Sequence, residues 1–210
     1  MRHFVRETLE TVLLAALLFL LLRVSVQNFR VEGASMEPAL HGGEYVFVNK
    51  LAYFHLPIGR IARLLPFLSV AEDKTVYPVG APRRGDVVVF QDPRGRERDL
   101  VKRVIALEGD VVALNGGVVH LNGRPLDEPY ILALPRGQDM APVRVPPRHV
   151  FVMGDNRLAS SDSRVWGPVS LSSLVGRVWV RYWPLGEARF FGAATMLQDG
   201  TAHAGRPAAH

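Results

Sequence analysis

The stretch GDVVVFQDPRGRERDLVKRVIALEGD, residues 85–110, decides the fold of this chain. It contains two runs dominated by valine and other apolar residues, 87–90 and 100–107, and turn-forming residues lie between and around them. β-Branched and aromatic side chains bounded by Gly, Asp, Asn or Pro are typical of strands. We therefore expect two strands here, within a sheet that shows no βαβ alternation and is mostly antiparallel.

Five further segments have the same character, so residues 28–191 are expected to form one mostly β, antiparallel domain. The pairs Asn115-Gly116 and Asn122-Gly123 are the strongest short-range signals for hairpin turns. They predict a hairpin-rich insertion at about residues 108–148. The five segments are EYVFVNK (44–50), GDVVAL (109–114), GVVHLNG (117–123), HVFVMGD (149–155) and GRVWVRYWP (176–184).

An apolar stretch, TLETVLLAALLFLLLRVSV, occupies residues 8–26. Its length is close to the roughly 20 residues that cross a bilayer as a helix, and no small-x-small cleavage site follows it promptly. We expect a single uncleaved transmembrane anchor at 8–27, after a short N-terminal segment at 1–7, rather than a cleaved signal peptide. Arginines lie on both sides of the span, so the positive-inside rule does not settle its orientation.

Two segments do not follow the strand pattern. Residues 51–78 mix apolar residues with arginines and prolines, and we expect a loop with a short helix that packs on the domain or dips into the membrane interface. Residues 192–210 are rich in Gly and Ala without periodicity, so a disordered tail is expected there.

The composition limits the possible functions. Of the 210 residues, 48% are hydrophobic and 21% charged, which suits a folded protein. The net charge is +5, but the basic residues are scattered without a long run, which argues against a nucleic-acid partner. The chain has no cysteine, and therefore no disulfide, thiolate nucleophile or cysteine metal site. It also has no HExxH and no glycine-rich phosphate loop, so we expect neither a metal nor a cofactor.

Lysine is rare in this chain. The 25 Lys and Arg residues include only three lysines, Lys50, Lys74 and Lys102. Arginine stays protonated in proteins, so any amine that acts as a base must be one of these three. Lys50 ends a predicted strand beside the polar Asn49, and Lys74 lies among acidic residues, so both are expected in solvent.

Lys102 differs because the two-residue period of a strand places it on one face with Leu100, Val104 and Ala106. A lysine buried among aliphatic side chains loses the hydration that favours its charge, and its pKa falls toward neutrality. A neutral amine can accept the proton of a serine hydroxyl and so activate a nucleophile. The alternative is a lysine at a strand edge whose amine reaches solvent.

The segment VEGASMEPAL, residues 31–40, places Ser35 only a few residues beyond the apolar span. Pro38 stops any helix soon after the serine. The segment is either a turn without chemistry, or it presents Ser35 as a nucleophile at a membrane surface.

A second polar segment, VMGDNRLASSDSR at 152–164, holds two acids, two arginines and three serines. Such a group can form a cluster of ion pairs and hydrogen bonds, or it is a polar surface turn after a strand. In the first case the Ser160 hydroxyl would orient the Lys102 amine. The bracing residues of the turn would be Asp155, Asp162 and Arg164.

These segments, in this order, resemble the bacterial type I signal peptidases, also called leader peptidases. The resemblance implies two fused antiparallel β regions on the extracytoplasmic side of the bacterial cytoplasmic membrane, held by a single-pass helix. It implies a serine endopeptidase that cleaves secretory preproteins after small-x-small motifs such as Ala-x-Ala. Besides the N-terminal span, the matching blocks are GASMEPAL (33–40), RRGDVVVF (83–90), VKRVIALEGD (101–110), the 152–164 segment and WGPV (166–169).

The resemblance also implies roles for individual residues. Ser35 aligns with the nucleophile and Lys102 with the general base of a serine-lysine dyad, and Ser160 aligns with a serine that hydrogen-bonds the lysine. The substrate would add as an extended strand, with shallow apolar pockets for its small side chains. The aligned pocket wall consists of Phe29, Val31, Met36, Leu40 and Val101.

Two positions depart from the family pattern. Gly33 stands where some members carry a serine whose hydroxyl helps to form the oxyanion hole. The hole would then consist of backbone N–H groups, chiefly that of Ser35. Leu158-Ala159 stand where many members have Asp-Asn, which affects the implied role of Ser160 only slightly.

Two other functions remain open from the sequence. Self-cleaving repressors also pair serine with lysine on a β scaffold, but they would carry a DNA-binding module instead of a membrane span. A membrane-tethered β module that only binds extended peptides would not need a neutral lysine near Ser35. We expect a monomer, although the sequence does not determine the oligomeric state.

Overall fold

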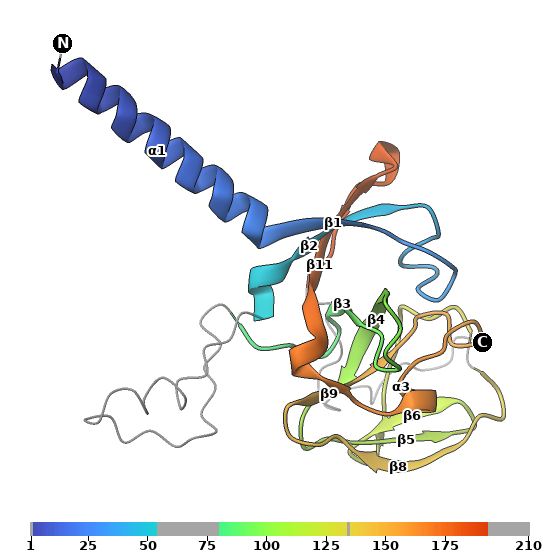
Figure 1. The fold of residues 1–210 in the computed structure, drawn as a ribbon. Coiled ribbons are helices and arrows are strands. Elements are labelled where there is room, and N and C mark those ends of the chain that lie inside the picture. The colour runs from blue at the N-terminus through green and yellow to red at the C-terminus, as the bar shows by residue number, and fades with distance from the viewer. Residues whose placement is uncertain (1, 54–79, 134, 193–210) are drawn as a thin grey trace, which may run out of the picture.

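The computed structural model describes residues 2–53, 80–133 and 135–192. Figure 1 shows a long N-terminal helix, α1 (Arg2–Ser25), that projects from a body built of two antiparallel sheets. The predicted class, mostly β and antiparallel with one apolar N-terminal helix, is therefore confirmed. The expectations for residues 54–78 and 193–210 fall outside the described residues.

Helix α1 is long and apolar enough to cross a membrane, and its apolar window is not buried against the body. The helix begins before the predicted span of 8–27 and ends at Ser25. The helix ends two residues before the predicted span does, because Val26 and Gln27 belong to strand β1 (Val26–Arg30) and pair with β2. Valine suits a strand as well as an apolar helix end, so the apolar pattern alone could not show where sheet pairing begins.

The larger sheet has the strand order β1-β2-β11-β3-β4-β9-β10, with β12 paired to β11, and all its pairs are antiparallel. The two strands predicted from residues 85–110 are β3 and β4, which pair with each other. The members not yet given are β2 (Tyr45–Asn49), β3 (Val87–Gln91), β4 (Asp99–Ala106), β9 (His149–Met153), β10 (Val169–Ser170), β11 (Leu174–Trp183) and β12 (Arg189–Phe190).

The smaller sheet has the order β7-β6-β5-β8 and lies within the segment predicted to be rich in hairpins. Its β6–β7 turn is Asn122-Gly123, with φ of 53° and 82°, as predicted. The β5–β6 turn is Gly116-Gly117, with φ of 57° and 90°, one residue later than predicted. The strands are β5 (Val111–Asn115), β6 (Val118–Leu121), β7 (Arg124–Pro125) and β8 (Met140–Arg144).

Short helical turns connect the strands. A four-residue helix, α3, begins at the end of the polar segment 152–164, and three 3-10 turns lie at the ends of β2 and β11. Their bounds are η1 (Lys50–Tyr53), α3 (Ser163–Trp166), η2 (Leu171–Ser173) and η3 (Leu185–Glu187).

Buried apolar side chains form three clusters, and strand β4 contributes to each of them. The face predicted for Lys102 is confirmed for Leu100 and Val104, which both pack in the second cluster. It is wrong for Ala106, which joins Ile105 in the third cluster, between β4, β9 and the smaller sheet. The β4–β9 register shifts between Val104 and Ala106, and this irregularity ends the two-residue alternation.

Candidate active site

Ser35 lies in the loop between β1 and β2. Val31 N donates to Glu44 O at 2.8 Å and closes this loop at its base. Met36 and Leu40 are 1% and 0% exposed and hold the loop in the first apolar cluster. The apolar neighbours thus fix the backbone around Ser35, while Ser35 itself stays only half-buried.

Lys102 lies in β4, opposite Val88 of β3, and is 4% exposed. Its Nζ is 2.6 Å from Ser35 Oγ and 2.9 Å from the carbonyl oxygen of Val101. Two residues 67 positions apart in the sequence therefore meet at hydrogen-bond distance. The amine is buried as the strand pattern predicted, whereas Lys50 is exposed.

Burial lowers the pKa of Lys102 from 10.5 to about 8, because the charged amine loses its hydration. Asp162 and Asp155 act in the opposite direction, since their negative charges favour a charged amine. A charged Lys102 donates to Ser35 Oγ, and a neutral Lys102 can accept from the Ser35 hydroxyl over the same 2.6 Å. The geometry and the lowered pKa together suit proton transfer from Ser35 to Lys102.

Ser160 does not make the predicted hydrogen bond to Lys102, because the amine is directed at Ser35 and at the carbonyl of Val101. The Ser160 hydroxyl is buried and has no hydrogen-bond partner. It lies beside Gly154: a Cβ added at Gly154 would overlap Ser160 Oγ and lie 2.5 Å from the carbonyl oxygen of Ser35. Ser160 is therefore close to the backbone of Ser35, with an unused donor and acceptor.

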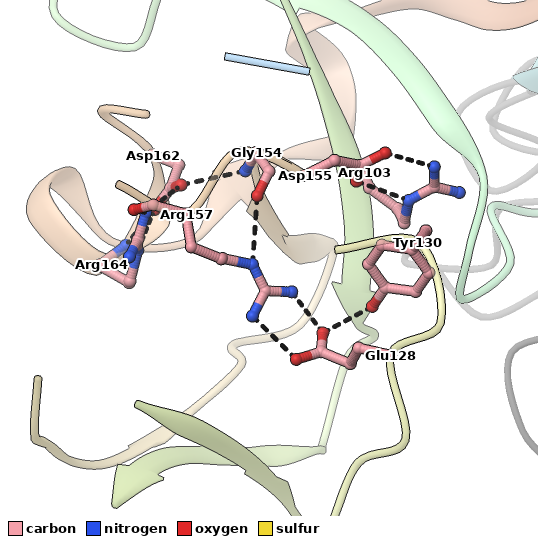
Figure 2. Close-up of polar contacts among 8 residues, drawn as sticks. All are labelled: Arg103, Glu128, Tyr130, Gly154, Asp155, Arg157, Asp162 and Arg164. Atoms are coloured by element: carbon pink, nitrogen blue, oxygen red, sulfur yellow. Dashed lines mark hydrogen bonds and ion pairs between the residues drawn. The ribbon is translucent and has the colours of Figure 1, made fainter. Parts of the chain in front are cut away.

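Figure 2 shows the polar network that surrounds Gly154 after β9. Asp162 Oδ2 accepts from Gly154 N at 2.9 Å, and Arg157 Nε donates to Gly154 O at 3.1 Å. Asp162 also binds Arg164 through two hydrogen bonds of 2.8 Å and caps helix α3. Asp162 and Arg164 thus lie where the sequence predicted braces for this turn.

Asp155, the third predicted brace, is 1% exposed and accepts two hydrogen bonds, of 2.8 and 2.5 Å, from Arg103. Arg103 follows Lys102 in β4, so this pair connects the turn to the strand that carries the amine. Asn156 N donates to the carbonyl oxygen of Ser35 at 3.1 Å. The turn is therefore bonded both to β4 and to Ser35.

The predicted pocket residues come together in the first apolar cluster. Two of these residues adjoin the dyad in the sequence, because Met36 directly follows Ser35 and Val101 directly precedes Lys102. Val31, Met36 and Leu40 are buried there, with Phe29 and Val101 partly buried against them.

Gly33 has a φ of 75°, in the left-handed region that favours glycine. A side chain at this position would be strained in this backbone conformation. No side-chain oxyanion donor comes from position 33 in this loop conformation.

Sequence reasoning missed Glu128 and Tyr130 and gave no individual role to Arg103 or Arg157. Glu128 forms an ion pair with Arg157, 29 residues away in the sequence. No local pattern marks Glu128. The available signal was Arg157 itself, because an arginine in a buried segment requires an anion from elsewhere in the chain.

A hydroxyl in contact with a buried amine is the arrangement that a serine nucleophile and an amine base require. Across the described parts of the chain, no group of three or more His, Asp or Glu residues could hold a metal ion. The family described as signal peptidase, peptidase S26, matches residues 5–183, and the chain belongs to this family. The resemblance drawn from the sequence is therefore confirmed.

Two relatives agree with this membership, and one solved structure is also similar. The chain is 35% identical over 178 residues to the signal peptidase I of Bacillus caldolyticus, which covers 78% of this chain and 82% of the relative. It is 35% identical over 188 residues to the signal peptidase I of Leptolyngbya laminosa, with 85% and 80% covered. The crystal structure of a signal peptidase I from Enterococcus faecalis V583 is 31% identical, with a TM-score of 0.42 over 46% of this chain and 96% of that chain.

Proposed function

We propose that this protein is a membrane-bound serine endopeptidase that removes N-terminal signal peptides from secretory preproteins after small-x-small motifs such as Ala-x-Ala. Ser35 is the nucleophile and neutral Lys102 is the general base. The observation that carries the proposal is the 2.6 Å contact between the buried amine and the half-buried hydroxyl. A module that only binds peptides would not need a desolvated amine at this position, and membership of the signal peptidase family supports the same activity.

The reaction is acyl transfer. Lys102 takes the proton of Ser35, and Ser35 Oγ attacks the scissile carbonyl carbon. Backbone N–H groups, chiefly that of Ser35, stabilise the oxyanion. The amine then gives its proton to the leaving amino group of the mature protein, and finally activates the water that releases the signal peptide.

The substrate binds as an extended strand. Residues 99–102 of β4 pair with β3, and the pairing with β9 begins only at Arg103. Among the described strands, one edge of β4 beside Lys102 is thus open to a peptide that adds by backbone hydrogen bonds. The small substrate side chains lie against the first apolar cluster, where Phe29, Val31, Met36, Leu40 and Val101 form the pocket wall.

The apolar helix explains why the site lies near the membrane. α1 crosses the bacterial cytoplasmic membrane, residues 1–7 are cytoplasmic, and the β domain at 28–191 is extracytoplasmic. Ser35 follows the end of α1 at Ser25 by ten residues, a reach of at most about 35 Å of extended chain. The nucleophile therefore stays close to the bilayer surface, where a translocated preprotein exposes its cleavage site.

Purified full-length protein should cut a preprotein that carries an Ala-x-Ala motif into two products. Mass determination should place the cut directly after the second alanine, because the pocket wall accommodates only small side chains on the acyl side. A matched preprotein with bulky residues at both alanine positions should stay intact. Cleavage at unrelated sites, or equal cleavage of both preproteins, would contradict the proposal.

Activity should rise with pH through an ionisation near pH 8, because only neutral Lys102 can accept the Ser35 proton. At pH 7 about a tenth of the amine is neutral, so kcat/KM should increase about tenfold to a plateau above pH 9. A pH profile of kcat/KM measures this ionisation in the free enzyme. The range from pH 6 to 9 extends roughly one pH unit or more on either side of this ionisation. A kcat/KM that stays constant over this range would exclude Lys102 as the base.

A further inference from the structure

Arg157 is the largest of the fully buried side chains among the described residues, and its charge is balanced from a distant part of the chain. Its Nη1 donates to Glu128 Oε2 at 2.8 Å, and its Nη2 donates to Oε1. Burial opposes the charge on Arg157, but the Glu128 carboxylate outweighs this effect and raises the pKa of the guanidinium. Glu128, in the connection between β7 and β8, is itself only 8% exposed.

Tyr130 joins this ion pair to a second one, as Figure 2 shows. Its hydroxyl donates to Glu128 Oε1 at 2.5 Å, and its ring lies under the Arg103 guanidinium, 4.3 Å from Cζ to the ring centroid. Burial and the Glu128 carboxylate raise the pKa of Tyr130, so its hydroxyl remains a donor. The Arg157–Glu128 and Arg103–Asp155 pairs are thereby connected through one aromatic residue.

The connected pairs approach the dyad from two directions. Arg157 reaches the carbonyl oxygen of Gly154, the residue that separates Ser160 from the backbone of Ser35. Arg103 directly follows Lys102 in β4 and binds Asp155. We propose that Glu128 and Tyr130, carried by the β7–β8 connection, are positioning residues that hold Ser35 and Lys102 at their contact distance. This inference rests on the proposed roles of Ser35 and Lys102.

Stability alone does not explain why the chain keeps this network. Replacing a buried ion pair by well-packed apolar residues is often neutral or stabilising. An apolar pair could fill the same space, but it could not donate to the carbonyl of Gly154 as Arg157 Nε does. The hydrogen bond to Gly154, in the turn after β9, is therefore the contribution that only the charged pair makes.

The double variant Glu128→Leu/Arg157→Met separates positioning from folding. It leaves no unpaired buried charge, but the Tyr130 hydroxyl loses its acceptor and the Gly154 carbonyl loses its side-chain donor, so its Tm should fall by about 5–15 °C while the protein remains folded. Its kcat on a peptide with Ala-x-Ala should fall about tenfold or more, while KM changes less than about twofold, because the pocket wall lies in another cluster. A folded double variant with wild-type kcat would overturn the proposal.

A single substitution within the network and a control outside it give a second test. Tyr130→Phe keeps the ring under Arg103 and removes only the donor to Glu128, so kcat should fall about two- to fivefold. Asp110→Asn is the matched control: Asp110 accepts three hydrogen bonds from Arg84 but none from the turn after β9. This control should keep kcat within about twofold. If the double variant does not fold, wild-type kcat in Tyr130→Phe overturns the proposal.

A titration of the Lys102 amine by NMR gives a readout that does not depend on activity. With only three lysines, the Lys102 signal is identified by its loss in Lys102→Met. In Glu128→Leu/Arg157→Met the amine should titrate at higher pH than in the wild type, because a loosened turn admits water to it. An unchanged titration would overturn the positioning role. Absence of any preprotein cleavage by the wild type would instead reject the proposed function and leave this titration readable.

Discussion

Replacing Lys102 by methionine should abolish peptide cleavage and at the same time stabilise the folded protein near pH 7. The activity should fall by about 10³-fold or more, since the proposed base for the Ser35 hydroxyl is lost. The pKa of Lys102 is lowered to about 8 from 10.5, which means that the folded state disfavours the charged amine. At pH 7 this penalty is on the order of 3 kcal/mol, and a methionine of similar length does not carry it.

The sign of this effect depends on pH. Between pH 8 and 10.5 the unfolded chain holds more protons on Lys102 than the folded chain does, so the stability contributed by the wild-type lysine rises across this window. The advantage of Lys102→Met should therefore be largest below pH 8 and disappear toward pH 10.5. Thermal unfolding in detergent at several pH values, with kcat/KM measured in parallel, checks both parts of the prediction.

Two variants serve as controls for this experiment. Lys50→Met removes an exposed lysine and should leave the activity unchanged. Ser35→Ala should lose as much activity as Lys102→Met, because either change removes half of the dyad, but it leaves the buried amine in place. If Lys102→Met were inactive and also less stable than the wild type, Lys102 would be a structural residue.

The sequence predicted those elements that depend on residues close together in the chain. The valines of residues 85–110 indicated β3 and β4, and the strand period indicated that Lys102 is buried. These predictions succeed because alternation and turn residues act over a few positions. The register shift after Val104 could not be predicted, because it depends on how β4 meets β9 and the smaller sheet.

The candidate site could also be predicted only in part. Ser35 and Lys102 stood out by residue type and by resemblance to a family, and the structure places them in contact. Glu128 did not stand out, because strands β8 and β9 separate it in the sequence from its partner Arg157. The orientation of Ser160 also escaped prediction, since it depends on where Lys102 directs its few hydrogen bonds.

Replacing Gly154 by alanine should lower both the stability of the protein and its kcat, because the added methyl group would collide with the backbone of Ser35. A Cβ at this position would overlap Ser160 Oγ and lie 2.5 Å from both Ser160 Cβ and the carbonyl oxygen of Ser35, closer than real Cβ contacts come. Gly154 cannot easily retreat, because Asp162 holds its N–H and Arg157 holds its carbonyl. We expect a loss of about 2–3 kcal/mol in the free energy of unfolding and a fall in kcat of about 100-fold.

A second variant shows which contact matters. Gly154→Ala/Ser160→Gly removes the overlap with the serine side chain but leaves the approach to the Ser35 carbonyl, which Asn156 holds in place. This variant should therefore recover part of the stability and little of the activity, because the strain still displaces Ser35 from its 2.6 Å contact with Lys102. Gly186→Ala, where the added Cβ meets nothing within 4 Å, should match the wild type in both measurements. Full activity in Gly154→Ala would mean that the added methyl group does not displace Ser35. The contact between Ser35 and Lys102 would then not depend on this turn.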